Sequence, residues 1–178
     1  MFTHLLVPTD GSALSDAAIQ MAVKLARENK ARLTALHVMP PFHVITYDTE
    51  MLSDTQARFA EIAAQNAETW LAAVARQAGE AGVECETVAV TRDHPYEAII
   101  DTATQRQCDL VVMASHGRSG MRGLLIGSET QKVLTHSDIP VLVVRPPMSS
   151  RTRHQTEAGE SADTSSPQPP QPFITLRA

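Results

Sequence analysis

Residues 110–128 read LVVMASHGRSGMRGLLIGS, an apolar run followed by a glycine-rich loop that leads into a helical segment. The run Leu110–Met113 shows almost no polar alternation, which is typical of a parallel strand buried on both faces of a sheet. In the loop, four glycines within eleven residues permit tight turns and let backbone N–H groups approach an anion closely. This stretch therefore predicts a parallel α/β sheet with a ligand loop at the carboxyl end of a strand.

The rest of the chain alternates short β-rich runs with helical segments. Further strands are expected at Leu5–Val7, Arg32–Val38, Val83–Val90 and Val141–Val144. Helices are expected from Ser12 through Leu25, from about Thr55 to Ala78, from Pro95 through Ala103, and over Ser128–Leu134. Since strand–helix–strand crossovers are right-handed, this alternation predicts an open five-stranded parallel sheet with helices on both faces. The fold class is flavodoxin-like or Rossmann-like α/β, with expected strand order 3-2-1-4-5.

Composition narrows the functional classes. A formal charge of −5 over 178 residues argues against a general nucleic-acid binder. Cys85 and Cys108 form neither a CxxC motif nor a metal-ligand pair, which favours a reducing compartment. The N-terminus shows no secretory pattern, and no apolar run approaches transmembrane length. We therefore expect a soluble cytoplasmic protein with no nucleic-acid or membrane partner.

The composition changes after Arg145, where the sequence becomes rich in Pro, Ser and Thr. We expect one domain over residues 1–146 and a disordered tail over residues 147–178, because the tail cannot bury enough apolar surface to offset its ordering entropy. The alternative to a solvated tail is a docking peptide anchored by Phe173, Ile174 and Leu176.

The first candidate binding loop is Pro8-Thr9-Asp10-Gly11-Ser12, directly after the first strand. Its place at a strand's carboxyl end suits a ligand loop. Asp10 would accept hydrogen bonds from ribose hydroxyls, as acidic residues do in other nucleotide-binding folds. The alternative role of Asp10 is to form a turn or to cap the first helix.

The second candidate loop leads into the helix expected at Ser128, whose first N–H groups and dipole favour a phosphate. Arg118 and Arg122 would add charge-assisted hydrogen bonds. Alternatively, Ser128 and Gln131 form a capping box, in which Ser128 only satisfies its own helix. Glu129 suits the helix dipole but would repel a phosphate unless its carboxylate points away.

Four collinear blocks, VPTDGS, LHV, MASHGRSG and GSETQKVLTHSDIPVLVV, resemble the universal stress protein (UspA) family over residues 1 to about 146. The family's nucleotide motif is Gly, two residues, Gly, nine residues, then Gly followed by Ser or Thr. This chain keeps the spacing through Gly117 and Gly127–Ser128, with Ala114 in place of the first glycine. If Ala114 is extended, as a strand end favours, its methyl group costs little, whereas a need for close backbone approach would lower the affinity.

The resemblance implies an adenine nucleotide ligand, ATP with or without Mg²⁺, and a regulatory or stress-response role. By resemblance, Asp10 meets the ribose, Val38 the adenine, and Ala114 the ribose and first phosphate; Gly117, Gly127 and Ser128 surround the phosphates. The predicted binding residues are Pro8, Thr9, Asp10, Val38, Met113, Ala114, His116, Gly117, Arg118, Gly127, Ser128 and Glu129.

We expect no enzyme activity and no protein-bound metal, because no residue stands out as a general base and no Walker lysine is present. His116 lacks the partners of a catalytic triad and is expected to pack or hydrogen-bond within its loop. Enzymes of the related adenylating or pyrophosphatase type carry SGGxDS after the first strand, where this chain has PTDGS. The alternative function is a nucleotide-free dimeric scaffold or interaction protein of the same fold.

The last strand, Val141–Val144, is fully apolar and is expected at the edge of the sheet. An uncovered apolar edge is an association hazard, so pairing with the same strand of a second copy is expected. The family resemblance also implies a homodimer through this strand. The alternative is that the following prolines and tail shield the edge in a monomer. The sequence leaves any other protein partner unknown.

Overall fold

The computed structural model describes residues 1–42, 49–116 and 126–145, and of residues 49–54 it describes the backbone alone. The strands are β1 (His4–Pro8), β2 (Arg32–Met39), β3 (Cys85–Thr91), β4 (Leu110–Ala114) and β5 (Val141–Val144). The helices are α1 (Ala13–Asn29), α2 (Thr49–Glu80), α3 (Pro95–Gln105) and α4 (Ser128–His136). The predicted element order is confirmed, although α2 begins before the expected Thr55. The predicted tail lies outside the described residues.

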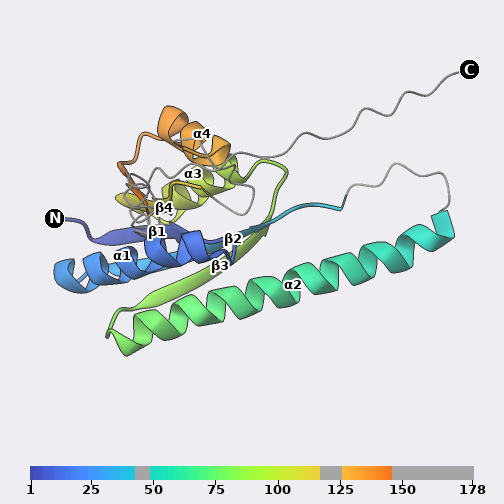
Figure 1. Cartoon of the computed structure of the whole chain (residues 1–178), viewed down its shortest axis with the longest axis horizontal. Helices are drawn as coiled ribbons and strands as arrows, with labels where there is room; N and C mark the ends of the chain where they lie inside the picture. The colour runs from blue at the N-terminus through green and yellow to red at the C-terminus, as the bar shows by residue number, and fades with distance from the viewer. Residues whose placement is uncertain (43–48, 117–125, 146–178) are drawn as a thin grey trace, which may run out of the picture. The chain divides into compact units, whose positions relative to one another are not determined.

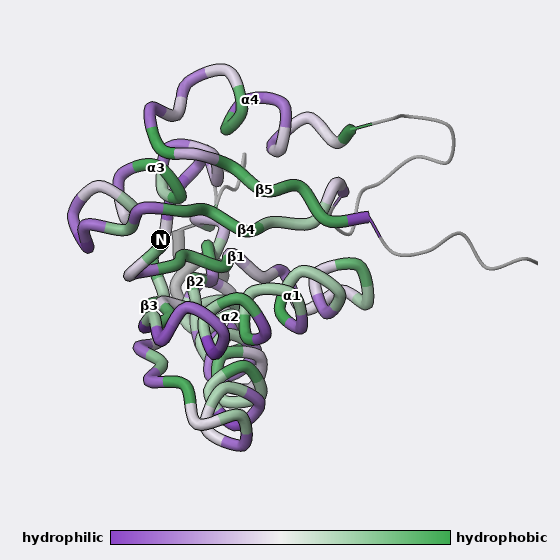
Figure 2. The backbone as a smooth tube through the Cα atoms, turned by 90° about the vertical axis from the view of Figure 1, so that its left-hand side faces the viewer, coloured by the Kyte–Doolittle hydropathy of each residue, from purple (hydrophilic) through white to green (hydrophobic). Residues whose placement is uncertain are grey.

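The five strands form one parallel sheet of order β3-β2-β1-β4-β5, as predicted. Helices α1 and α2 lie on one side of this sheet, and α3 and α4 lie on the other (Figure 1). Seen from the side, the strands stack from β5 to β3, with strongly hydrophobic colouring along β4 and β5 (Figure 2). Both faces of the central strands are therefore covered, as their unbroken apolar sequence predicts.

Each face of the sheet has its own core. Successive side chains of a strand point to opposite faces, so Leu5 and Val7 join one cluster while Leu6 joins the other. The cluster under α1 and α2 includes Ile19, Leu33, Leu71, Val74 and Val112. The cluster under α3 and α4 includes Leu36, Ile99, Val111, Met113 and Val133. Burial of these side chains fixes the register of the strands and hence the positions of the loops that follow them.

Two further features concern the part of the chain that the structure describes. None of its helices is both long and apolar enough to cross a membrane. Within the same residues, no group of three or more His, Cys, Asp or Glu side chains is placed to hold a metal ion.

Cys85 and Cys108 are free thiols, and burial raises the pKa of Cys108 to about 11. Cys108 therefore remains protonated and packs as a small apolar side chain.

Candidate functional site

The candidate site lies where β1 and β4 run side by side. After β1 the chain crosses to β2 on one side, and after β4 it crosses to β5 on the other, so the winding reverses between them. Ligands of open parallel sheets bind at this switch point, beyond the carboxyl ends of the strands. The described residues brought to this edge are Pro8, Thr9, Asp10, Val38, Met113, Ala114, His116, Gly127, Ser128 and Glu129. Gly117, Arg118 and Arg122 lie outside the described residues.

Thr9 fixes the loop after β1 to its neighbours. Its N–H donates to Leu36 O at 2.8 Å, and its carbonyl oxygen lies 2.7 Å from Nδ1 of His37. Its hydroxyl lies 3.1 Å from the Ser15 hydroxyl and accepts a bond from the Gly11 N–H at 3.2 Å. Thr9 is buried, so its side chain holds the loop in place rather than facing a ligand.

Asp10 fulfils the turn-forming role that the sequence left as an alternative. Its Oδ1 accepts the Ser12 N–H at 3.1 Å and the Ser12 hydroxyl at 2.6 Å. Ser12 in turn is the N-cap of α1, where its Oγ accepts the Ser15 N–H at 3.3 Å. Asp10 is nevertheless only half-buried and sits at the carboxyl edge of the sheet. The turn therefore orients the carboxylate without removing it from the candidate site.

Position 11 requires glycine for two reasons: its backbone conformation, and the lack of room for a side chain. Its φ of +72° is in the left-handed region, and a Cβ there would lie 2.3 Å from Cε2 of Trp70. The indole of Trp70 also meets the His37 ring edge-on, with ring centroids 4.9 Å apart. No sequence spacing links Trp70 to this loop, so the sequence carries no signal for its place beside the site.

Ala114 ends β4 in extended conformation, paired with Val144. The described non-glycine residues with positive φ are Lys30 and Gln107, so alanine replaces the family glycine without backbone strain. The expectation of an extended Ala114 is confirmed. Its carbonyl oxygen accepts the Thr130 hydroxyl at 3.0 Å, which fastens the start of α4 to the end of β4.

The capping-box alternative for Ser128 is wrong. The N-cap of α4 is Gly127, and Ser128 is the first helical residue. The boundary is set by the Gly127 N–H, which donates to Ser115 O at 2.7 Å, and the first intrahelical bond runs from the Gln131 N–H to Gly127 O. No side chain among the described residues caps this helix. The N–H groups of its first turn have no intrahelical acceptors, which makes this end of the helix favourable for an anion.

Glu129 faces α3. Its carboxylate accepts the Tyr96 N–H at the start of α3 at 3.0 Å and the Lys132 ammonium at 2.8 Å. The Tyr96 N–H lies in the first turn of α3 and would otherwise lack an acceptor. Glu129, which belongs to α4, therefore caps the start of α3. The hydrogen bond to Glu129 raises the pKa of Lys132. The negative charge near the start of α4 is thus offset by a neighbouring cation.

The remaining predicted binding residues differ in how far their side chains are exposed to solvent. Met113 is buried in the core beneath α3 and α4, so its backbone rather than its side chain lies at the strand end. Val38 is half-buried beside Val90, and Pro8 is half-buried at the end of β1. His116 contacts Ser115 through Nδ1 at 3.2 Å, as expected for a loop histidine, while its buried Nε2 has no partner among the described residues.

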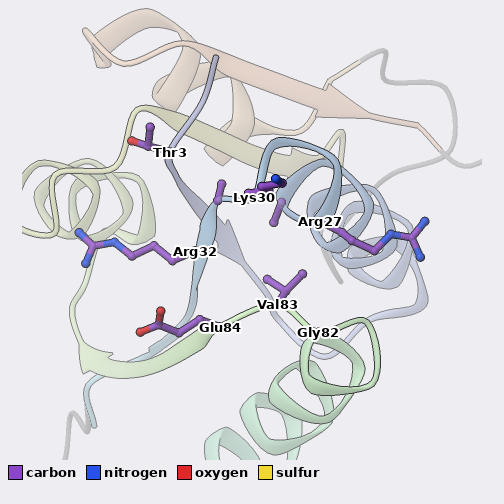
Figure 3. Close-up of a pocket in the computed structure, with 9 residues that line it drawn as sticks. Thr3, Arg27, Lys30, Arg32, Gly82, Val83 and Glu84 are labelled. Carbon is purple, nitrogen blue, oxygen red and sulfur yellow. The ribbon is translucent and has the colours of Figure 1, made fainter.

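A cavity of about 440 Å³ lies at the opposite edge, near the amino ends of β1 to β3 (Figure 3). Its lining includes Arg27, Lys30, Arg32 and Glu84. The guanidinium groups of Arg27 and Arg32 point in opposite directions in Figure 3. These charges do not converge on one point, so the cavity is a weaker candidate for an anionic ligand than the carboxyl edge.

Comparison with known proteins gives one consistent family. The model of the Universal stress protein family matches residues 1–145. Universal stress protein YxiE of Bacillus subtilis is 33% identical over 150 residues, covering 82% of this chain and 100% of that protein. UspA of Lactobacillus plantarum superposes with a TM-score of 0.69 at 28% identity, covering 80% of this chain and 97% of that one. A universal stress protein in complex with cAMP superposes with a TM-score of 0.60 at 27% identity, covering 81% and 97%.

Proposed function

This chain belongs to the universal stress protein family, and from that premise we propose that it binds an adenine nucleotide as a regulatory stress-response factor. The favoured ligand is ATP, with or without Mg²⁺. The observation that carries the proposal is that the Asp10 turn follows β1 while the start of α4 is fastened to the end of β4, and β1 and β4 are paired neighbours at the switch point of the sheet. The related structure with cAMP supports the adenine-nucleotide class.

Each part of the nucleotide has a matching feature at this edge. The Asp10 carboxylate is the acceptor for ribose hydroxyls, since its turn holds it at the end of β1. The first-turn N–H groups of α4, which no side chain among the described residues caps, serve the phosphates. Half-buried Val38, which packs beside the core under α3 and α4, offers an apolar surface to the adenine.

We propose binding without metabolic turnover. The Asp10 and Glu129 carboxylates already accept backbone N–H groups, and Glu129 also pairs with Lys132. These structural hydrogen bonds occupy acceptor positions of both carboxylates, which leaves fewer of them to accept a proton from an attacking water. Incubation with ATP should therefore release ADP at a rate far below that of metabolic ATPases. Release at roughly one per second or faster, the range of ordinary enzymes, would contradict this part of the proposal.

The test of ligand identity is mass spectrometry of small molecules released from the purified, gently denatured protein. We expect an adenine nucleotide at near-stoichiometric yield, and micromolar calorimetric binding of ATP, but not GTP, to the stripped protein. No released nucleotide together with no measurable ATP binding would favour the alternative, a nucleotide-free scaffold. The cytoplasmic location expected from the sequence stays a prediction.

We also propose a homodimer through β5. The bonds from Val111 N–H to Pro140 O and from Ser115 N–H to Val144 O turn alternate residues of β5 toward β4. Val141 and Val143 therefore direct their backbone groups to the open edge. An antiparallel partner strand from a second copy would satisfy those groups around a two-fold axis.

Light scattering after size exclusion tests the dimer. Val143→Pro removes an edge-facing N–H and should give a monomer, whereas Val143→Thr keeps that N–H and the β-branched shape and should stay dimeric. A single cooperative melting transition in both variants would show that the domain itself still folds, while loss of the dimer lowers the melting temperature of Val143→Pro. A monomeric wild type at tens of micromolar would overturn the proposal.

A further inference from the structure

Trp70 on α2 packs directly against the loop after β1, at Gly11 beside the proposed ribose ligand Asp10. A Cβ built on Gly11 would lie 2.3 Å from Cε2, 2.4 Å from Cδ2 and 2.6 Å from Nε1 of the indole. The indole therefore occupies the space in which any other residue at position 11 would place its side chain. Since Gly11 also has φ of +72°, this contact and this backbone conformation both require glycine.

His37 completes the support from the same side. Its ring stands at 72° to the indole of Trp70, with centroids 4.9 Å apart, and its Nδ1 lies 2.7 Å from the Thr9 carbonyl oxygen. The edge-to-face arrangement is a favourable one for two aromatic rings. Trp70 and His37 therefore contact the loop on either side of Asp10, at Thr9 through His37 and at Gly11 through the indole.

Trp70 is less buried than the core residues of α2, so packing in the core is not its only role. Among residues 55–80 of α2 the buried ones are Ala67, Leu71, Val74 and Ala78, whereas Trp70 is half-buried. The indole thus lies at the margin of the core, against a glycine that no larger residue could replace. Glycine in an unsupported loop samples a wide range of backbone conformations. Contact with the indole restricts that range at the residue next to Asp10.

We propose that Trp70 is a positioning residue for ribose recognition. The indole holds Gly11, the held loop fixes the direction of the Asp10 carboxylate, and that carboxylate accepts the ribose hydroxyls. This inference rests on the proposed nucleotide-binding function. It adds that α2, an element outside both ligand loops, sets how well the site distinguishes a ribose from a sugar without hydroxyl groups.

The experiment compares the binding of ATP and of 2′,3′-dideoxy-ATP by calorimetry. Both nucleotides carry the same phosphates and base, so their ratio of affinities reports the ribose hydroxyls alone. Trp70→Ala should weaken ATP binding about tenfold, the scale of a lost charge-assisted hydrogen bond, while leaving dideoxy-ATP binding within about twofold. Trp70→Phe keeps a ring beside Gly11 and should recover most of the preference for ATP.

The matched control is Val74→Ala, one turn further along α2. Val74 is fully buried in the same core, so its truncation should lower the melting temperature without changing the ATP to dideoxy-ATP ratio. If Trp70→Ala fails to fold, Trp70→Leu keeps apolar volume on α2 but removes the flat ring beside Gly11, so it tests the same contact without changing the loop. We expect the same selective loss of ATP affinity.

The outcomes separate this inference from the function on which it rests. A wild type that binds ATP, beside a folded Trp70→Ala or Trp70→Leu variant that discriminates equally well, would overturn the positioning role and leave the nucleotide site standing. An equal loss for both nucleotides, or the same loss in Val74→Ala, would assign the effect to general destabilisation. A wild type that binds neither nucleotide would overturn the proposed function and the inference together.

Discussion

Asp10 performs a structural and a proposed ligand-binding task, and two substitutions separate them. Its Oδ1 accepts both the backbone N–H and the hydroxyl of Ser12. Asn at this position keeps an oxygen that can accept the same two bonds but carries no charge. Ala removes the oxygen as well. Asp10→Asn should therefore test the charge alone, and Asp10→Ala should test the charge and the turn together.

The magnitudes follow from the bonds that each variant loses. Asp10→Ala deletes two partly exposed hydrogen bonds, worth about 1–2 kcal/mol together, which corresponds to a melting temperature lower by roughly 2–8 °C for a domain of this size. It should also weaken ATP binding by about 1–3 kcal/mol, or roughly 5- to 150-fold. Asp10→Asn should leave the melting temperature within about 2 °C and weaken ATP binding by about 1 kcal/mol, close to fivefold.

The assays are differential scanning calorimetry for stability and isothermal titration calorimetry for ATP. We expect the two measurements to give different results: both variants lose affinity for ATP, and only Asp10→Ala loses stability. An Asp10→Asn protein that binds ATP like the wild type, beside an Asp10→Ala protein that only melts earlier, would refute it. Asp10 would then be a turn residue without a role in ligand binding.

Three further predictions concern other positions. Gly127→Ala places a Cβ 3.2 Å from Ser115 O, so it should lower stability by about 1 kcal/mol and weaken ATP binding; a variant with wild-type melting and affinity would contradict the close packing there. Glu129→Gln keeps an acceptor for the Tyr96 N–H but removes a charge near α4, so ATP affinity at low salt should rise about two- to fivefold, and a fall would show that the carboxylate itself contacts the ligand. Burial lowers the pKa of His4 from 6.5, so its contribution to stability is complete above that pH and is lost as the pH falls below it; urea unfolding at pH 7.5 and 5.5 should show this loss in the wild type and not in His4→Gln.

The fold was predictable because the decisive signals are local. Val111 and Val112 lie in an unbroken apolar run, and both are fully buried on opposite faces of β4. Once strands and helices alternate, the handedness of crossovers leaves few arrangements of the sheet. The carboxyl ends of β1 and β4 then mark the candidate site without any tertiary information.

The details of the site depend on contacts between residues far apart in sequence. Trp70 meets Gly11, and Glu129 caps α3 through the Tyr96 N–H, yet no spacing rule links the members of either pair. The capping rule failed at Ser128 for a related reason, because a hydrogen bond from Gly127 to the β4 loop sets where α4 begins. Local propensity allows the helix to begin at either of two neighbouring residues, and tertiary packing determines which one is used.

We propose above all that an adenine nucleotide binds beyond the carboxyl ends of β1 and β4. The most direct test of this proposal is a titration of isotopically labelled, nucleotide-stripped protein with ATP, followed by ¹H–¹⁵N NMR. We expect the amide signals of residues 9–12 and 128–130 to shift together and saturate, while those of residues 27–32 beside the opposite cavity stay in place. Shifts confined to residues 27–32, or no shifts at millimolar ATP, would contradict it.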